Sequence, residues 1–252
     1  MLERLKVKTI LVSQPEPKSD ASPYHELARK QKVNIDFRPF IYVEGLDGAE
    51  VRQQKISLTD HTAVILTSRN AVDHYFRVSE EMRFEVPTSM KYFCMSESIA
   101  FYLQKYITYR KRKIYFGKQR FSDLIDTIKK HKNEHFLLPS SDLLKPLIPQ
   151  LLEDNKINYS RAILYKTVCS DLSDLEDVYY DILVFFSPSG IKSLFQNFPD
   201  FKQNDTRIAA FGQTTVKAVT DAGLKVNIEA PSVKAPSMTM ALEQYIKAVN
   251  KK

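Results

Sequence analysis

Val64-Ile-Leu-Thr-Ser-Arg-Asn-Ala-Val-Asp-His-Tyr-Phe76 has a close counterpart later in the chain, Val184-Phe-Phe-Ser-Pro-Ser-Gly-Ile-Lys-Ser-Leu-Phe195. Each copy begins with a short apolar run, continues through a turn rich in hydroxyl groups, and ends in a segment with the apolar spacing of a helix. A strand that leads through a turn into a helix is the building unit of a parallel sheet. The pattern therefore predicts an α/β fold that is built twice.

Two further pairs of segments follow in the same order. Tyr92–Phe101 parallels Ala209–Ala218, and Phe121–Ile125 parallels Pro236–Met240. Short β-branched and aromatic runs predict the strands, and Ser22 before Pro23 predicts a helix start. We therefore expect two similar parallel-sheet domains of the flavodoxin or Rossmann type. The predicted strands are 8–13, 63–67, 92–95, 113–116, 135–138, 182–186, 208–211 and 225–228, with a helix at 23–31.

One segment breaks this order. Leu137–Lys145 resembles Leu11–Lys18, at the start of the chain, rather than a segment beyond 240. The first domain would therefore begin at the amino end, leave, and be completed by the carboxyl-terminal part. We predict domain one at 1–36 and 169–252, an inserted domain two at 44–161, and two extended linker strands at 37–43 and 162–168.

Composition excludes several classes of protein. The 252 residues are 43% hydrophobic and 27% charged, which is typical of a folded domain rather than a disordered chain. Two cysteines, Cys94 and Cys169, are too few for a disulfide framework. The longest apolar run, Ile182–Phe186, is far shorter than a membrane span, and the amino end lacks the apolar stretch of a signal peptide. We expect a cytoplasmic protein.

Other motifs do not indicate nucleotide or metal binding. Only six glycines occur, with no G-x-G-x-x-G and no Walker A sequence. His131-Lys-Asn-Glu-His135 matches an H-x-x-E-H zinc signature but lies at a polar helix end, so we predict no metal there. The net charge of +7 suits a polyanionic partner, and it is equally natural as solubility charge. The basic run Tyr109–Lys113 makes nucleic-acid binding a third hypothesis, although its position before a strand favours a solvated loop.

Five stretches resemble uroporphyrinogen-III synthase, and the resemblance covers nearly the whole chain. They comprise three strand-to-helix turns, one Tyr-x-Thr strand and a final loop with its helix. Two places depart from the family pattern: Gln14 stands where an Arg is usual, and Pro139–Asp142 replaces a turn with Gly and Arg. The five stretches are Leu66–Val72, Leu164–Thr167, Phe185–Lys192, Ala210–Val219 and Ala230–Leu242.

The resemblance implies a cyclising lyase of tetrapyrrole biosynthesis, the route to haem, sirohaem and cobalamin. Its substrate, hydroxymethylbilane, would lose its terminal hydroxyl as water, invert ring D through a spiro intermediate, and close to uroporphyrinogen III. The resemblance further implies no cofactor, a monomer, and neither nucleic acid nor a membrane as partner. The alternative is a non-catalytic two-domain binding protein for a small polyanionic ligand, built on the same turns.

The resemblance also implies which residues act. Tyr165 is the expected catalytic residue, because a phenol can donate a proton or hydrogen bond to the departing hydroxyl. The substrate carboxylates need donors, which the amides and hydroxyls of turns that open helices supply; helix capping alone is the competing interpretation. The expected substrate-binding residues are Thr67, Ser68, Arg69, Ser98, Ser140, Ser187, Ser189, Gly190, Gly212, Gln213, Thr214 and Thr215.

Overall fold

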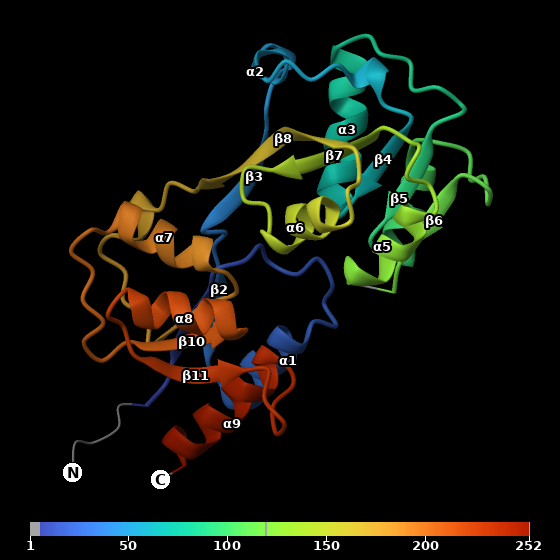
Figure 1. The fold of residues 1–252 in the computed structure, drawn as a ribbon. Helices are drawn as coiled ribbons and strands as arrows, with labels where there is room; N and C mark the ends of the chain where they lie inside the picture. Colours follow the sequence, from blue (N-terminus) through green and yellow to red (C-terminus); the bar gives the residue numbers. More distant parts are fainter. Residues whose placement is uncertain (1–5, 119, 252) are drawn as a thin grey trace. The chain divides into compact units, whose positions relative to one another are not determined.

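The computed structural model describes residues 6–118 and 120–251 (Figure 1). Contacts between residues divide the chain into two compact units. We call Met1–Tyr42 with Val168–Lys252 the terminal unit, and Val43–Thr167 the inserted unit. The predicted domain limits themselves stay a prediction, which limited proteolysis at 37–43 and 162–168 would test.

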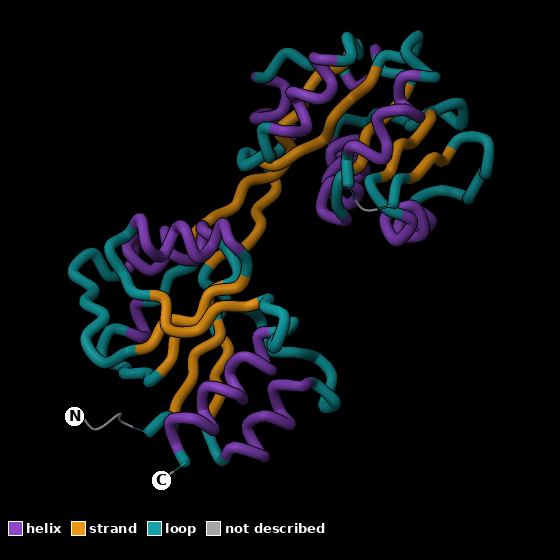
Figure 2. Tube along the Cα trace, turned by 60° about the horizontal axis from the view of Figure 1, so that its bottom comes forward, coloured by secondary structure: helices purple, strands orange, loops and turns teal. Residues whose placement is uncertain are grey.

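The terminal unit is a five-stranded sheet in the order β11-β10-β9-β1-β2, and all four strand pairs are parallel. Helices α1 and α9 pack on one face and α7 and α8 on the other. Figure 2 shows these helices on either side of the strands. The bounds are β1 Thr9–Val12, α1 Pro23–Gln31, β2 Asn34–Phe37, β9 Ile182–Phe185, α7 Pro188–Asn197, β10 Arg207–Phe211, α8 Gln213–Asp221, β11 Val226–Ala230 and α9 Met238–Asn250.

The inserted unit has a six-stranded sheet in the order β3-β8-β7-β4-β5-β6. Helices α3 and α4 cover one face, and α5 and α6 cover the other. The short helix α2 lies between β3 and β4. The bounds are β3 Ile41–Gly45, α2 Gly48–Gln53, β4 Ala63–Leu66, α3 Arg69–Glu81, β5 Lys91–Cys94, α4 Glu97–Tyr102, β6 Ile114–Phe116, α5 Ser122–Lys129, β7 Phe136–Ser141, α6 Leu147–Asp154 and β8 Tyr159–Cys169.

The two sheets share one arrangement, which confirms the predicted fold class. The terminal unit has the order β2-β1-β9-β10-β11, and the inserted unit has the order β8-β7-β4-β5-β6 with β3 added beside β8. The matched strands β4 and β9, β5 and β10, and β7 and β1 therefore occupy the same places in their sheets, while the third pair of segments lies at the starts of helices α5 and α9. The chain enters the two units at different strands, which is why Leu137–Lys145 matches the amino end instead of a later segment.

The central strands are apolar along their whole length because helices cover both faces of each sheet. In β9, Ile182 and Val184 pack toward α1 and α9, while Leu183 and Phe185 pack toward α7 and α8. All four residues of β4 are buried in the same manner. Such strands appear in the sequence as uninterrupted apolar runs, and this made them recognisable.

Three strands differ from the prediction. β2 was not predicted, because its pattern Asn-Ile-Asp-Phe is half polar and suits the edge position that it occupies. β7 continues through Pro139 to Ser141, where a turn was expected. The ladder from β7 to β4 runs from Phe136 to Leu137, so the proline lies beyond it and its missing N–H costs no bond to β4. β8 starts at Tyr159 and pairs with β7 in parallel over most of its length.

The two ends of the terminal unit are tied together. The Asn250 side chain accepts a hydrogen bond from the Val7 N–H at 2.9 Å and donates one to the Val7 carbonyl at 2.9 Å. Helix α9 thereby ends against the residue that leads into β1. No helix of the described residues is long and apolar enough to cross a bilayer.

Asp181 anchors the amino end of β1, and its removal is expected to destabilise the terminal unit. Its Oδ2 accepts hydrogen bonds from the N–H groups of Lys8 and Thr9 at 2.7 and 2.9 Å, and the carboxylate is 9% exposed. Asp181→Ala would leave these partly buried donors without their acceptor, which costs about 2–4 kcal/mol of unfolding free energy. Urea unfolding measures the loss. Asp177→Ala, at an exposed position, is the control, and an equal effect of both variants would contradict the assignment.

Candidate functional site

In the terminal unit, two predicted turns follow adjacent strands. β9 and β10 are parallel neighbours, so the turns at Ser187 and Gly212 lie at the same edge of the sheet. Ser187 is the N-cap of α7, and its Oγ accepts a hydrogen bond from the Gly190 N–H at 3.3 Å. A Cβ at Gly190 would lie 3.1 Å from the Phe185 ring, so the first turn of α7 packs closely on β9. Ser189 lies in that first turn, between Pro188 and Gly190.

The start of α8 presents main-chain donors. Gly212 adopts φ +84°, a left-handed conformation that favours glycine, and its N–H donates to the Ala230 carbonyl at 2.6 Å. Gln213 and Thr214 are exposed, and their amides open the helix with no intrahelical carbonyl to bond. Thr215 is buried, and its hydroxyl has no hydrogen-bond partner among the described residues. The start of α8 therefore offers an anion two amides without an intrahelical partner, at the positive end of a helix.

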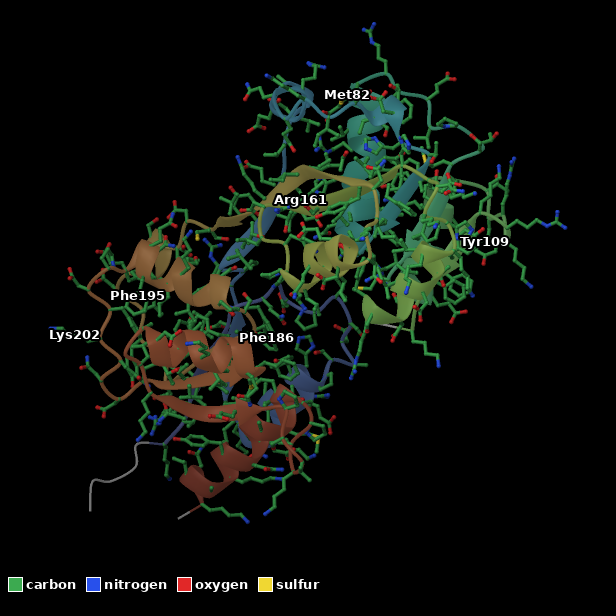
Figure 3. The ribbon with its side chains drawn as sticks, in the orientation of Figure 1. Met82, Tyr109, Arg161, Phe186, Phe195 and Lys202 are labelled. Atoms are coloured by element: carbon green, nitrogen blue, oxygen red, sulfur yellow. The ribbon has the colours of Figure 1, made fainter. Side chains whose placement is uncertain are left out.

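Two aromatic rings line the same edge, and the sequence interpretation did not include them. Phe186, labelled in Figure 3, directly follows β9, and Phe211 is the last residue of β10; their ring centroids are 5.7 Å apart. Both are only half-buried. They add an apolar surface beside the amides of α7 and α8.

In the inserted unit, Thr67, Ser68 and Arg69 follow β4. Ser68 is the N-cap of α3, and its Oγ accepts a hydrogen bond from the Ala71 N–H at 3.0 Å. Ser98 follows β5, the neighbour of β4, and its Oγ lies 2.9 Å from the Oγ of Ser96, the N-cap residue of α4. These turns therefore share one edge of the inserted sheet, as Ser187 and Gly212 do in the terminal sheet.

Arg69 is oriented by a cluster of side chains that the sequence did not reveal. Its guanidinium carbon lies 5.3 Å from the centre of the Tyr102 ring. The Tyr102 and Tyr106 hydroxyls both donate to the Asp73 carboxylate, from 2.8 and 2.5 Å. Burial alone would raise the pKa of Asp73, but these hydrogen bonds and the charge of Lys105 together lower it. Asp73 is therefore ionised at neutral pH and fixes the ring beneath Arg69.

Tyr165 lies next to the Ser68 turn. Its hydroxyl oxygen is 3.2 Å from Ser68 Oγ, and its ring stacks on His74 at 4.8 Å between centroids. The side chain is 7% exposed. Burial raises the pKa of Tyr165, and the hydrogen bond with Ser68 opposes this in part. The phenol is therefore protonated at neutral pH and is able to act as a donor.

Ser140 lies in β7 rather than in a turn. It is 1% exposed, its Oγ accepts from Arg161 Nε at 3.0 Å, and it donates to the Ser141 carbonyl at 3.1 Å. Arg161 also donates to the carbonyls of Ser141 and Asp142 at 2.9 and 3.0 Å. Arg161, labelled in Figure 3, thus brings a guanidinium from β8 to the end of β7, where the sequence showed none.

The histidine motif is part of the packing. His131 Nδ1 lies 3.0 Å from the Thr127 carbonyl, and Nε2 lies 3.1 Å from the Tyr115 hydroxyl. Within residues 6–118 and 120–251, no group of three or more His, Cys, Asp or Glu side chains is placed to hold a metal ion.

Three comparisons with known proteins agree. The family model described as Uroporphyrinogen-III synthase HemD matches residues 22–240. The uroporphyrinogen-III synthase of Saccharomyces cerevisiae is 27% identical over 139 residues, which cover 49% of this chain and 50% of that protein. The match thus spans about half the length of this curated relative.

Solved structures show the same fold. Uroporphyrinogen-III synthetase from Helicobacter pylori has a TM-score of 0.62 at 17% identity, over 96% of this chain and 100% of that one. A mutant uroporphyrinogen III synthase from Thermus thermophilus has a TM-score of 0.57 at 13% identity, over 98% and 100%. The family match covers well over half of the chain and agrees with the resemblance of the five stretches. The chain belongs to the uroporphyrinogen-III synthase family.

Proposed function

We propose that this protein catalyses the reaction of its family, the cyclisation of hydroxymethylbilane to uroporphyrinogen III with loss of water. The observation that carries the proposal is Tyr165, a buried, protonated phenol beside a helix start in the inserted unit. Helix starts that follow neighbouring parallel strands support it, because they suit a substrate with four acetates and four propionates.

The proposed chemistry asks the protein to hold the substrate and to donate one proton. The bond between the terminal methylene carbon and its hydroxyl oxygen breaks, driven by electrons of the adjacent pyrrole. Tyr165 donates a hydrogen bond or its proton to the departing oxygen, so that water leaves. The cation that remains is attacked by ring D at its substituted carbon, which gives the spiro intermediate. Its rearrangement and the loss of a ring proton give the closed macrocycle.

We propose that main-chain and hydroxyl donors bind the carboxylates. Gln213 and Thr214 offer main-chain donors in the terminal unit, together with Ser187 and Ser189, and Thr67–Arg69 with Ser98 offer donors in the inserted unit, while Gly190, Gly212 and Thr215 shape these helix starts. Phe186 and Phe211 offer a surface for a pyrrole ring. Ser140 acts through Arg161, because its own hydroxyl is buried and bonded.

The test is to supply hydroxymethylbilane and to separate the product isomers by chromatography. We expect the type III isomer, whereas uncatalysed closure gives type I. Type I alone would contradict the activity. If the substrate then raised the melting temperature without turnover, the protein would be a binding protein for a polyanion.

We further propose that the protein acts in the cytoplasm as a monomer, without a cofactor, and independently of nucleic acid. Light scattering after gel filtration measures the mass, for which 29.1 kDa is expected. Unchanged mobility of DNA and RNA at low salt is expected, since a nucleic-acid binder of this charge would retard them.

A further inference from the structure

Strand β8 contains a β-bulge directly before Tyr165. Ser140 of β7 pairs with Ile163, but the next residue, Ser141, pairs with Tyr165, so Leu164 is an extra residue in β8. Side chains alternate between the faces of a regular strand, and Ala162 and Leu164 both pack on the α3 face. Without the bulge Tyr165 would point to the opposite face. With it, Tyr165 joins the same core cluster and contacts Ser68 and His74.

Arg77 of α3 contacts the bulge through the carbonyl of its extra residue, Leu164. Its Nη2 donates to the carbonyl of Leu46 at 2.7 Å and to that of Leu164, the bulged residue, at 3.3 Å. The Leu46 N–H donates to the same Leu164 carbonyl at 2.9 Å. Gln54 completes the arrangement, since its side-chain amide bonds both the N–H and the carbonyl of Ile163, at 2.9 and 2.7 Å.

The same arginine fixes the ring that supports Tyr165. Arg77 Nε donates to His74 Nδ1 at 3.2 Å, so the neutral imidazole carries its proton on Nε2. Arg77 Nη1 bonds Glu81, which orients the guanidinium further. Gly45 leaves room for it, because a Cβ there would lie 2.7 Å from Arg77 Nη2. One guanidinium thus determines both the backbone that carries Tyr165 and the aromatic surface on which it rests.

We propose that Arg77 is a positioning residue for the reaction, which holds the β8 bulge and the His74 ring so that the Tyr165 phenol faces Ser68. The inference rests on the proposed function and assigns Arg77 no contact with the substrate. A proton donor must lie within hydrogen-bond reach of the departing oxygen, and a displacement of about 1 Å is enough to slow a reaction strongly.

The test compares Arg77→Met and Arg77→Lys with Arg52→Met, a control at an exposed arginine of α2. We expect kcat for the type III product to fall about ten-fold in both Arg77 variants at unchanged KM, because a positioning residue does not bind the substrate. Arg52→Met should match the wild type. Unchanged kcat in both Arg77 variants, or a rise in KM alone, would overturn the proposal.

A double-mutant cycle with Tyr165→Phe separates positioning from general loss of folded protein. If Arg77 acts through the phenol, Arg77→Met lowers kcat in the wild type and has no further effect in Tyr165→Phe. An equal fractional loss in both backgrounds would mean a structural role only and would reject the proposal. These outcomes differ from failure of the proposed function, in which the wild-type protein itself yields no type III isomer.

The ring contact gives a second, independent pair of variants. His74→Phe keeps an aromatic surface under Tyr165, whereas His74→Leu removes it at similar size. We expect His74→Phe to retain more of kcat than His74→Leu. The reverse order, or equal activity, would show that the ring does not position the phenol.

Discussion

Tyr165→Phe is expected to lower kcat about a hundred-fold, the lower end of what a positioned proton donor contributes. The substitution removes the hydroxyl and leaves the ring, which keeps its stacking on His74. The protein should stay folded, because the hydrogen bond to Ser68 is worth only about 1 kcal/mol. Steady-state rates of type III formation and a urea unfolding curve measure the two quantities.

Tyr109→Phe is the matched control for this substitution. Tyr109 lies in the same unit and is 38% exposed, so the loss of its hydroxyl should change neither rate nor stability. Full activity in Tyr165→Phe would remove the phenol from the mechanism. A fall in kcat that matched a loss of folded protein would do the same.

Gln213→Pro is expected to raise KM about ten-fold while Gln213→Ala leaves it nearly unchanged. Proline at the first position of a helix fits the backbone and removes only an amide hydrogen that has no intrahelical partner. The preceding Gly212 has ψ 147°, an extended value that a following proline favours. A hydrogen bond from an amide to a carboxylate is worth about 1.5–3 kcal/mol, and each 1.4 kcal/mol changes affinity about ten-fold.

The alanine variant separates the two parts of Gln213. It removes the side chain and keeps the amide, so the difference between the two variants reports the main-chain donor alone. Circular dichroism of both proteins checks that α8 is retained. Equal KM values for the alanine and proline variants would exclude the amide of Gln213 from carboxylate binding.

The repeated architecture could be predicted because each strand and the turn after it have a recognisable local sequence pattern. β4 and β9 are apolar along their length, since helices cover both faces, and a hydroxyl-rich turn follows each. The order of the matched segments also predicted that one domain is inserted into the other. Leu137–Lys145 matches the amino end of the chain only if the chain enters the two domains at different strands. The family resemblance added Tyr165, which no spacing argument would have selected among 13 tyrosines.

The contacts of Tyr165 could not be predicted from the sequence, because they depend on strand register and on contacts between residues that are far apart in the chain. Regular alternation along β8 would place the side chains of Tyr165 and Leu164 on opposite faces of the sheet. The bulge places them on the same face, and it is recognised only from the pairing of β8 with β7. The hydrogen bond from Arg77 to the Leu164 carbonyl joins residues that are 87 positions apart in the sequence. Asp73 and Tyr102 likewise appear as ordinary helix residues until α3 and α4 pack together.

Burial also explains why Ser140 was misplaced as a turn residue. A Pro-Ser-Ser-Asp sequence has the composition of a loop. Here β8 pairs with it as a strand as far as Ser141, and Arg161 supplies the hydrogen bonds that its hydroxyl and carbonyl oxygens need. Ser140 is buried within a strand, and Arg161, 21 residues away, supplies the hydrogen bond that its hydroxyl oxygen needs.

The two hydrogen bonds between Asn250 and Val7 bring the first and last described segments of the terminal unit together, so the strand orders of the two units can be compared as closed cycles. If the chain were closed there and opened between Val168 and Ile182, the terminal unit would run β9-β10-β11-β1-β2. The inserted unit runs β4-β5-β6-β7-β8 in the same spatial order. Leaving aside the additional strand β3, the strand topologies of the two units are therefore related by a circular permutation.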